Sequence, residues 1–561
     1  MSRSSEKGGV DMTANLYRQI FDSYSSYYET SDNKFCLVKK QLSNQSDREL
    51  IDRKNFIGHF TASAFVITKA PRRVLLIHHT FLKKYLQPGG HIEVSDNTPL
   101  DAAARELAEE SGVDIASLKY HCVSPLDRQV PFNIDIHSIP ENKKKQEAAH
   151  YHYDMQYLFL SEKEPSITID KSESSSFEWV EWSQFKEMAK FRDIANKIED
   201  LMEPSPRRFL SDIARKQQDI SCIAIQHIVR NSLPFIYLLD DIFRDDLTIF
   251  AKPNSIDQSV WDELKSAGIK LRVAKRDPDN AELFFGIKDK PTILLDIGGY
   301  FAKLAAGGGL PIIGIVEDTE NGHQKYNSII SKVKYPVFSV ARNPLKESED
   351  FLVGSGIVFG ASYMLRLENT LLNYMKVSCI GYGKIGRGIC AHLRSVGVTP
   401  TVIEKNPLRS IIASRDGNNI ALNPDLSATD IVFCATGSHS LDIHNFRSMK
   451  NGLFIVVATS SEDEFLLDYL SEEYQKTKIG RYITKYKNDN NYFYMLNDGI
   501  PPNFAVGSAL DNYIFLTHAT IIESINEVLR LGKNAKTGVI YELTDSSNRD
   551  IATKWLNEFH P

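Results

Sequence analysis

The sequence lacks the cysteine pattern of a zinc ribbon or of a fold held together by disulfides. Its 561 residues include 6 cysteines, and no two of them form a CxxC pair. Structural zinc sites and thiol redox motifs depend on such close pairs. We therefore expect free thiols in a reducing compartment and a cytoplasmic protein.

The chain also lacks an excess of positive charge and a long apolar run. Its 66 lysines and arginines face 72 aspartates and glutamates, for a formal net charge of -6. It therefore offers no basic field to nucleic acid or to an anionic membrane. No apolar run reaches the roughly eighteen residues of a membrane-spanning helix, and the first residues lack the apolar core of a signal peptide. We expect neither a nucleic-acid partner nor a membrane segment.

The chain does contain enough apolar material for several domains. Hydrophobic residues make up 42% of its 561 residues and charged residues 25%, an ordinary globular balance. Two prolines close together at 202–208 indicate a linker. The expected segments are a polar, partly helical extension at 1–50, domains at 51–205, 215–375 and 376–500, and a C-terminal helix with a polar tail at 501–561.

The two halves of the chain differ in hydrophobic pattern. Runs rich in Val, Ile and Phe around a proline predict two strands within 60–79, and 150–160 alternates as another strand. After the linker, short apolar runs such as 292–299 and 311–318 end in glycine or an acid, and this alternation continues to about 460. Such runs are typical of buried parallel strands in a doubly wound α/β fold. A long amphipathic helix is expected at about 509–531.

A glycine pair followed by a glutamate-rich helix marks the first half. The spacing predicts a helix at 99–111, closed by a glycine. Glu106, Glu109 and Glu110 then project to one side of it. Like charges repel unless a cation neutralises them, and Mg²⁺ prefers such oxygen ligands. A lone pattern of this kind also fits a solvated acidic face, so the flanking residues decide between the two.

Those flanking residues resemble the Nudix box of the Nudix hydrolases. The order is Gly-Gly, an acid, then Arg-Glu-Leu-x-Glu-Glu-x-Gly-Val. The resemblance implies that Glu106, Glu109 and Glu110 hold Mg²⁺ or Mn²⁺ together with the main-chain carbonyl of Gly90, and that Arg105 orients a glutamate. It also implies an αβα sandwich and hydrolysis of a nucleoside diphosphate linked to another moiety, with Glu109 or Glu110 as a base.

The loop before this helix departs from the family pattern. Asp96 stands where the family has a glutamate, and the stretch 97–104 before Arg105 is one residue longer than usual. An extra loop residue costs little, so we expect the metal-binding helix to be intact. Glu173 and Glu178 are candidates for a further ligand or base.

Two histidines lie on one face of the expected strand at 150–160. His150 and His152 alternate there with tyrosines, and Asp154 follows on the same face. Such a pair can bind a metal, but it more commonly packs or forms hydrogen bonds, which is the interpretation we prefer. A His-x-His-x-Asp strand occurs in some Nudix hydrolases, which implies a position facing the substrate.

A glycine-rich turn marks the second half. It follows an apolar strand and opens a helix, and the next strand ends in an acid. In this Rossmann context the glycines let the backbone approach a pyrophosphate and the acid binds ribose hydroxyls, so NAD is the expected cofactor. The alternative is the same fold with an empty cleft. The expected cofactor-binding residues are Gly381, Gly383, Gly386, Glu404, Thr436 and Gly437.

The region from roughly 215 to 560 is similar to S-adenosylhomocysteine hydrolase. The matching stretches are "LLDIGG", "GIVEDTENGHQKY", "PVFSVARNPLKESED", "GYGKIG" and "CATG". In that family NAD transiently oxidises the 3′ carbon of the substrate ribose, so that the neighbouring proton becomes acidic and the 5′ thiol group is eliminated. The resemblance implies Lys346 and Asp350 as catalytic residues, Asp318 at a ribose-binding position, and a homo-oligomer.

Several positions depart from that family. Ile297 stands where the family has a second catalytic aspartate, Phe351 replaces an asparagine, and Ser355 replaces a cysteine. The family's cofactor-side asparagine is lost in "VVATSSEDE", and no convincing match to its substrate-binding "HMT" stretch is found. Since an isoleucine can neither take a proton nor hold a hydroxyl, ordinary adenosylhomocysteine hydrolysis is not expected.

These motifs leave three functional hypotheses for an α/β chain with a Nudix sandwich followed by Rossmann-type parallel sheets. The leading one is a Mg²⁺-dependent Nudix pyrophosphohydrolase acting on a nucleotide-type small molecule. The second is an NAD-using enzyme acting on a nucleoside-like substrate. The third makes the second half a nucleotide sensor or an oligomerisation scaffold that regulates the Nudix domain.

Overall fold

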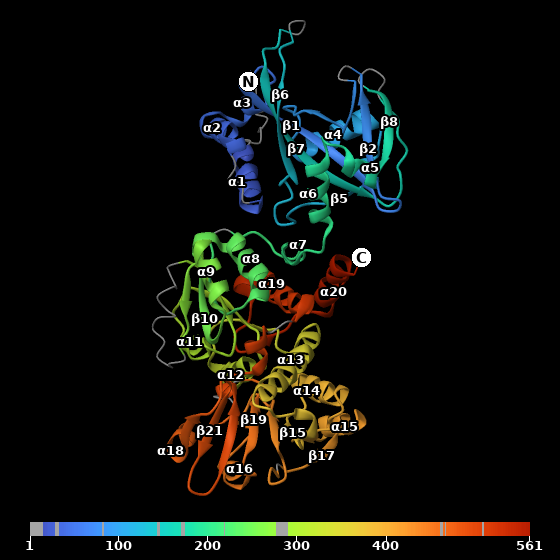
Figure 1. Ribbon diagram of the computed structural model, residues 1–561. Helices are drawn as coiled ribbons and strands as arrows, with labels where there is room; N and C mark the ends of the chain where they lie inside the picture. The colour runs from blue at the N-terminus through green and yellow to red at the C-terminus, as the bar shows by residue number, and fades with distance from the viewer. Residues whose placement is uncertain are drawn as a thin grey trace. The chain divides into compact units, whose positions relative to one another are not determined.

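The structure is a computed structural model in two compact units, Met1–Arg208 and Phe209–Pro561, which are described separately (Figure 1). The boundary falls at the proline-rich segment where the sequence predicts a linker, and the short helix α7 (Pro206–Ser211) begins there. The described residues are 15–28, 33–80, 83–142, 146–169, 174–217, 219–275, 290–423, 425–459, 464–465, 467–507 and 510–560.

A mixed sheet forms the centre of the first unit. Its strands follow the order β3-β2-β1-β7-β5, while β4 also pairs with β1, β6 with β7 and β8 with β2. The long strands β1 and β7 run parallel. The strands predicted within 60–79 and at 150–160 are confirmed. The bounds are β1 (Gly58–Thr68), β2 (Arg73–His79), β3 (Lys84–Leu86), β4 (Gly89–His91), β5 (Lys119–Tyr120), β6 (Asn133–Ile139), β7 (His150–Ser161) and β8 (Ser174–Glu181).

The N-terminal segment, although polar in composition, packs into the core of this unit. Its first helix buries aromatic residues at helical spacing, and Tyr17 stacks on Phe60 of β1 with ring centroids 5.2 Å apart. Phe21 and Tyr24 are buried in the same core. The helices are α1 (Leu16–Tyr28), α2 (Cys36–Asn44), α3 (Asp47–Leu50), α4 (Pro99–Ser111), α5 (Trp182–Glu187) and α6 (Arg192–Met202).

The helix α4 has the bounds that the sequence predicts, because local signals set both of its ends. The side chain of Thr98 accepts a hydrogen bond from the N–H of Asp101, and Pro99 occupies the first turn. Gly112, with a φ of 66°, ends the helix in the left-handed conformation. The helix lies beside β1 (Figure 1). Its Leu107 is fully buried in the core of this unit.

The second unit contains two doubly wound sheets. The first is wholly parallel, in the order β11-β10-β9-β12-β13-β14-β23. The predicted α/β class is confirmed by this alternation of strands and helices. Its strands are β9 (Ser221–Ile228), β10 (Leu247–Ile256), β11 (Leu271–Val273), β12 (Thr292–Asp296), β13 (Ile312–Glu317), β14 (Val337–Ser339) and β23 (Ile540–Tyr541).

The second sheet carries the glycine-rich turn. Its order is β17-β16-β15-β18-β19-β22-β21-β20, parallel as far as β22 and antiparallel beyond it. Its strands are β15 (Val377–Ile380), β16 (Thr401–Ile403), β17 (Asn419–Ala421), β18 (Ile431–Cys434), β19 (Leu453–Val457), β20 (Gln475–Lys478), β21 (Ile483–Lys487) and β22 (Tyr492–Leu496).

Helices cover both sheets of the second unit. Among the described residues, no helix combines the length and the apolar character needed to cross a membrane. The helices are α8 (Leu233–Phe243), α9 (Gln258–Ser266), α11 (Ala302–Gly307), α12 (Glu320–Ile329), α13 (Lys346–Leu367), α14 (Lys384–Ser395), α15 (Pro407–Arg415), α16 (Ile443–Ser448), α18 (Leu467–Glu473), α19 (Ile514–Leu531) and α20 (Asp545–Phe559).

The C-terminal segment differs from the polar tail that the sequence predicts. The predicted helix begins at Ile514 rather than at 509, which lies outside the described residues. The residues beyond it form the edge strand β23 of the first sheet and the helix α20. The prediction of a tail was wrong because α20 is polar in overall composition, which hides the few apolar residues that it buries. These include Ile551 and Trp555.

Glycines bring α13 and α14 into backbone contact. A Cβ atom on Gly354 would collide with the carbonyl oxygen of Ile385, and one on Gly388 would collide with that of Phe351. Only glycine, which has no Cβ atom, lets the two helix backbones approach each other this closely. The two helices also meet through Asp350 of α13, whose Oδ2 lies 3.5 Å from Nζ of Lys384, the first residue of α14.

Candidate functional site

Gly90 lies directly against one of the predicted metal ligands. A Cβ atom added to Gly90 would stand 2.6 Å from either carboxylate oxygen of Glu106. A larger side chain there would force the Glu106 carboxylate to move, so glycine lets that carboxylate approach the main chain of β4. The structure therefore brings together two of the four groups that the sequence predicts to hold a metal.

Arg105 connects the acidic groups around it. Its Nε and Nη2 atoms donate to the two carboxylate oxygens of Asp96, each at 3.0 Å, and Nη2 also donates to the His91 carbonyl at 3.0 Å. Its Nη1 atom donates to Glu106 and Glu109, each at 2.9 Å. The hydrogen bonds with Asp96 raise the pKa of Arg105 despite its partial burial. Asp96 therefore reaches Arg105 with both oxygens, despite the longer loop.

The glutamates at the end of α4 have opposite environments. Glu110 is buried, and its Oε2 accepts a hydrogen bond from the N–H of Gly89 at 2.9 Å. The side chain of Glu109 is 60% exposed. The structure thus places one carboxylate inside the unit beside β4 and the other at the surface, where water reaches it.

The predicted glutamates do not meet at a common point in the described residues. Within the described residues, three candidate metal ligands do have donor atoms that all lie within 4.8 Å of one another. They are His59, His150 and His152. Glu106 and Glu109 accept hydrogen bonds from Arg105, and Glu110 accepts one from the N–H of Gly89. Of the further candidates, Glu173 lies outside the described residues, and Glu178 is exposed on β8 opposite Leu76 of β2.

A cavity of about 1340 Å³ lies between the two sheets of the second unit. It is lined by the predicted catalytic residues Lys346 and Asp350, and by Asp318. Of the predicted cofactor-binding residues, Gly386 alone is absent from the lining, because it is buried beneath the turn. The others in the wall are Gly381, Gly383, Glu404, Thr436 and Gly437.

The three glycines of the turn have different roles. Gly381 has a φ of +96°, and a Cβ atom on it would stand 2.6 Å from the Ala435 carbonyl oxygen. A Cβ atom on Gly386 would collide with the Gly381 carbonyl oxygen. Gly383 differs, because the nearest heavy atom to its Cβ position is Nη1 of Arg409 at 3.9 Å. The first and third glycines allow the turn and its packing, whereas the second leaves backbone open to the cavity.

Two carboxylates brace the edge of this cleft. Glu404 accepts a hydrogen bond from the N–H of Tyr382 at 2.7 Å, which holds the acid beside the glycine-rich turn. Glu464, which sequence reasoning missed, is fully buried and accepts from the N–H groups of Thr436 at 2.9 Å and Gly437 at 2.7 Å. The signal available in the sequence was the position of Glu464 after the strand β19. Nothing near it in the sequence indicates that it contacts Thr436 and Gly437.

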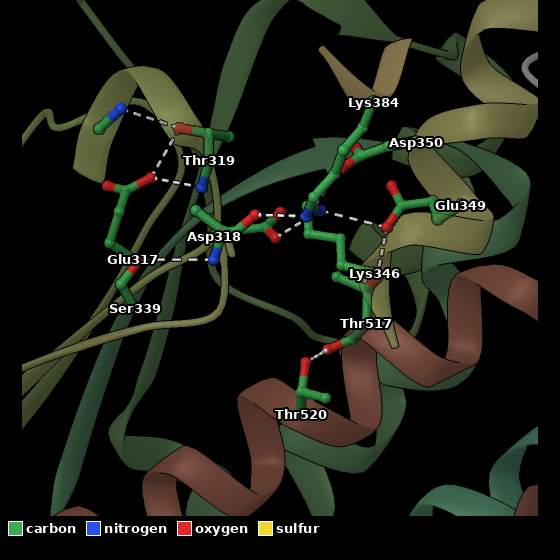
Figure 2. A network of polar contacts seen from close by, with 12 residues as sticks. Glu317, Asp318, Thr319, Ser339, Lys346, Glu349, Asp350, Lys384, Thr517 and Thr520 are labelled. Atoms are coloured by element: carbon green, nitrogen blue, oxygen red, sulfur yellow. Dashed lines mark hydrogen bonds and ion pairs between the residues drawn. The ribbon is translucent and has the colours of Figure 1, made fainter. Parts of the chain in front are cut away.

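A buried lysine joins two carboxylates in the wall of this cavity (Figure 2). The Nζ atom of Lys346 donates to Asp318 at 2.8 Å and to Glu349 at 3.1 Å. The Thr517 hydroxyl on α19 also donates to Glu349. The structure therefore brings Lys346 and Asp318 together, and it adds Glu349 and Thr517, which the sequence analysis did not single out.

Burial and charge act in opposite directions within this network. Burial alone would lower the pKa of Lys346, but the three neighbouring carboxylates hold it well above its usual range. Burial would raise the pKa of Asp318, but Lys346 outweighs it and lowers that pKa. Burial raises the pKa of Asp350, whose Oδ2 lies 3.5 Å from Nζ of Lys384. Asp318 therefore carries a charge, while Asp350 is shifted toward the protonated form.

The stability of the second unit is expected to depend on pH through Glu349. Burial raises its pKa from 4.5 to about 7, although Lys346 opposes the shift. The folded state thus binds this proton more tightly, so the stabilisation is complete below about pH 4.5 and is lost as the pH rises through about 7. Glu349→Gln should remove this contribution, up to about 3 kcal/mol, while keeping an oxygen for Thr517 and Lys346.

The measurement is urea unfolding of the full chain and of Glu349→Gln at about pH 5 and about pH 8. The variant should gain stability relative to the wild type as the pH rises. An identical pH dependence in both proteins would show that Glu349 titrates at its ordinary pKa.

Two cavity histidines were also missed by sequence reasoning. His227, at the carboxyl end of β9, contacts the Ser255 hydroxyl at 2.5 Å and stacks on Phe504. His518 stacks on Phe235, with ring centroids 4.5 Å apart. Burial lowers the pKa of each histidine to about 3, so both are neutral at pH 7. A histidine at the end of a buried strand was the signal for His227.

Ile297, which stands where the hydrolase family has an aspartate, is a core residue. It is 3% exposed and belongs to the apolar core of the first sheet. The neighbouring Asp296 accepts from the N–H groups of Tyr300 and Phe301, each at 2.9 Å. Glu317 accepts from loop N–H groups as well. These acids hold the loop in place and do not line the cavity.

Two family models match separate parts of the chain. The NUDIX domain matches residues 58–201. The NAD-binding domain of S-adenosyl-L-homocysteine hydrolase matches residues 363–505. The chain thus carries both domains, and the first belongs to the domain class of the Nudix pyrophosphohydrolases.

Curated relatives match part of the chain. The chain is 27% identical to an S-inosyl-L-homocysteine hydrolase of Methanopyrus kandleri, over 43% of this chain and 58% of that protein. It is 29% identical to an adenosylhomocysteinase of Aeropyrum pernix, over 34% of this chain and 47% of that protein. The chain therefore spans about half the length of these relatives. A solved NUDIX-family hydrolase from Clostridium perfringens is 25% identical, with a TM-score of 0.21, over 26% of this chain and 98% of that one.

Proposed function

We propose that the first unit is a pyrophosphohydrolase that uses Mg²⁺ or Mn²⁺, because a NUDIX domain here retains its acidic helix. The substrate class is a nucleoside diphosphate linked to another moiety. The observation that carries the proposal is the placement of the Glu106 carboxylate against Gly90, with Arg105 joining it to Glu109. A cytoplasmic location and a homo-oligomer stay predictions.

The donor set fits a hard divalent cation. Glu106, Glu110 and the Gly90 carbonyl offer only oxygen ligands, which Mg²⁺ and Mn²⁺ prefer. The cation would neutralise phosphate charge and make a bound water more acidic. Glu109, which is exposed, would take a proton from that water. Arg105 holds the glutamates in position through the hydrogen bonds described above.

The experiment that tests this function is hydrolysis of a panel of nucleoside-diphosphate-linked compounds by the full chain. Release of a nucleoside monophosphate should require Mg²⁺ or Mn²⁺ and should stop when the metal is chelated. The compound cleaved with the highest kcat/KM identifies the linked moiety. No metal-dependent cleavage of any member would contradict the proposal.

A second function is supported by the cavity of the second unit. The open backbone at Gly383 and the acid at Glu404 fit the pyrophosphate and ribose of NAD. The cofactor would supply a reversible hydride acceptor. Lys346 and Asp350 line the same cavity, so a nucleoside-like substrate can contact them next to the cofactor. Asp350, with its raised pKa, is suited to exchange a proton with a substrate hydroxyl.

The remaining alternative is a nucleotide sensor or scaffold. The apolar Ile297 at the position of the family's aspartate favours it, because the set of catalytic groups that the family provides is then incomplete. Under this alternative, NAD or adenosine changes the Nudix rate and is not consumed. A transient NADH absorbance with a nucleoside-like substrate would instead favour the enzyme.

Gly383→Ala is expected to weaken NAD binding by about tenfold or more, because its Cβ would occupy the open path of the pyrophosphate. Gly307→Ala is the matched control, since its Cβ meets no atom within 4 Å and it lies on α11 of the same unit. Calorimetric titration with NAD measures both. Equal affinity for NAD in the two variants, or no binding by the wild type, would contradict an NAD site at this turn.

A further inference from the structure

Five histidines gather on one face of the sheet in the first unit. Their parent strands meet there because β7 pairs with both β1 and β6, which places His152 beside His59 on one side and His137 on the other. The ring centroid of His59 lies 4.7 Å from that of His152 and 5.0 Å from that of His150. The five residues are His59 on β1, His91 on β4, His137 on β6, and His150 and His152 on β7.

This histidine face is opposite the acidic helix α4. Gly90 faces Glu106 of α4, whereas the preceding residue, Gly89, faces Ser63 of β1. Side chains alternate along a strand, so His91 shares the face of Gly89. Accordingly, the His91 ring packs on His59, at a centroid distance of 5.2 Å. The histidines are thus separate from the glutamates that the Nudix motif assigns to Mg²⁺.

Three of these histidines direct ring nitrogens at one point. His59, His150 and His152 each offer a donor atom, and the three atoms lie within 4.8 Å of one another. His59 is fully buried, and its Nε2 has no hydrogen-bond partner among the described residues. An unpaired polar atom in such a position carries a substantial energetic cost unless something binds it.

In His150 and His59, the contact made by Nδ1 determines which ring nitrogen carries the proton and which keeps a lone pair. Nδ1 of His150 lies 2.7 Å from the Ala148 carbonyl oxygen, and Nδ1 of His59 lies 3.4 Å from that of Asn55. Since a carbonyl oxygen only accepts, each Nδ1 carries the proton and each Nε2 is left with a lone pair. Metal-binding histidines usually donate their other N–H in this way.

We propose that His59, His150 and His152 bind a Zn²⁺ ion. Zinc bound by imidazoles has Zn–N distances of about 2.0–2.1 Å, so two ligands of a tetrahedral ion lie about 3.3 Å apart. The Nε2 atoms of His150 and His152 are separated by 3.3 Å. A set of nitrogens alone favours zinc over Mg²⁺, which prefers oxygen. Three ligands leave a fourth position, and the partly exposed His152 opens it to water or to an anionic group.

The same short separation also fits a hydrogen bond from His152 to His150, the packing interpretation that the sequence favours. That interpretation leaves Nε2 of His59 without a partner, whereas an ion satisfies all three nitrogens.

The test is a titration of the metal-stripped full chain with Zn²⁺ in competition with a chromophoric chelator. The wild type should bind about one Zn²⁺ tightly, and His59→Gln and His152→Gln should bind it at least about 100-fold more weakly. His78→Gln, on β2 of the same sheet, is the matched control and should bind as the wild type does. Glu106→Gln should also keep this Zn²⁺, because its carboxylate lies on the other face.

X-ray absorption of the zinc-loaded wild type keeps the proposal testable if a variant fails to fold. It should show nitrogen ligands at about 2.0–2.1 Å with the scattering of about three imidazoles. The proposal is overturned if the wild type binds Zn²⁺ no better than folded His152→Gln. It is also overturned if the bound Zn²⁺ is lost in Glu106→Gln, or if its ligands are oxygens. None of these outcomes depends on the pyrophosphohydrolase activity.

Discussion

Hydrolysis dependent on Mg²⁺ is expected to fall by about 10³-fold in kcat/KM when Glu109 and Glu110 are both replaced by glutamine. The neutral amides keep nearly the same shape but cannot balance the charge of a divalent cation. Glutamine at position 110 still has an oxygen for the N–H of Gly89, so the local fold should persist. The loss would therefore report on metal binding and on proton transfer from water. The measurement is a steady-state assay with the best substrate of the panel.

Glu187→Gln is the control for this double variant, because Glu187 is exposed at the end of α5 in the same unit. It should retain the wild-type rate. Circular dichroism and thermal unfolding establish that all three proteins are folded. If the wild type and the double variant hydrolyse the panel equally well, or are equally inert, Glu109 and Glu110 do not carry this activity.

Lys346→Met is expected to destabilise the second unit by about 3–5 kcal/mol, because it leaves buried carboxylates without their cation. In the folded state Lys346 is 6% exposed, and its Nζ donates to both Asp318 and Glu349. Methionine fills a similar volume but supplies no charge. Urea unfolding of the full chain at about pH 8 measures the change, since the carboxylates are most highly ionised there.

An exposed ion pair provides the matched control for that loss. Lys478 contacts Asp498 at the surface of the second unit, and its side chain is 47% exposed. Lys478→Met should therefore cost at most about 1 kcal/mol. Adding Asp318→Asn to Lys346→Met should recover part of the stability, because it removes one of the stranded charges. A loss for Lys346→Met no larger than that for Lys478→Met would show that the buried pair contributes no net stabilisation.

Local signals account for the parts of the candidate sites that could be predicted. The bounds of α4 follow from the Thr98 cap and from Gly112, both adjacent to the helix. The glycine-rich turn was recognised between its strand and its helix for the same reason. A cap or a positive φ acts within a few residues, so the sequence nearby suffices to identify it.

Contacts between distant segments account for what could not be predicted. Glu464 supports Thr436 and Gly437 from beyond β19, and Thr517 reaches Glu349 from α19. Nor does the polar C-terminal segment reveal that it completes the first sheet as β23. Packing of this kind depends on which buried faces meet, and many alternative pairings satisfy the same hydrophobic pattern.

The proposed zinc site shows most clearly the difference between what local signals predict and what distant contacts decide. The sequence by itself determined that His150 and His152 share one face of a strand, because strand geometry alternates with a period of two. It could not show that His59 meets them, since that depends on the parallel register in which His59 pairs with His152. A shift of one residue would turn His59 to the opposite face. Thus the sequence determined the ligand types and the local spacing, and only the tertiary structure decided which donors converge.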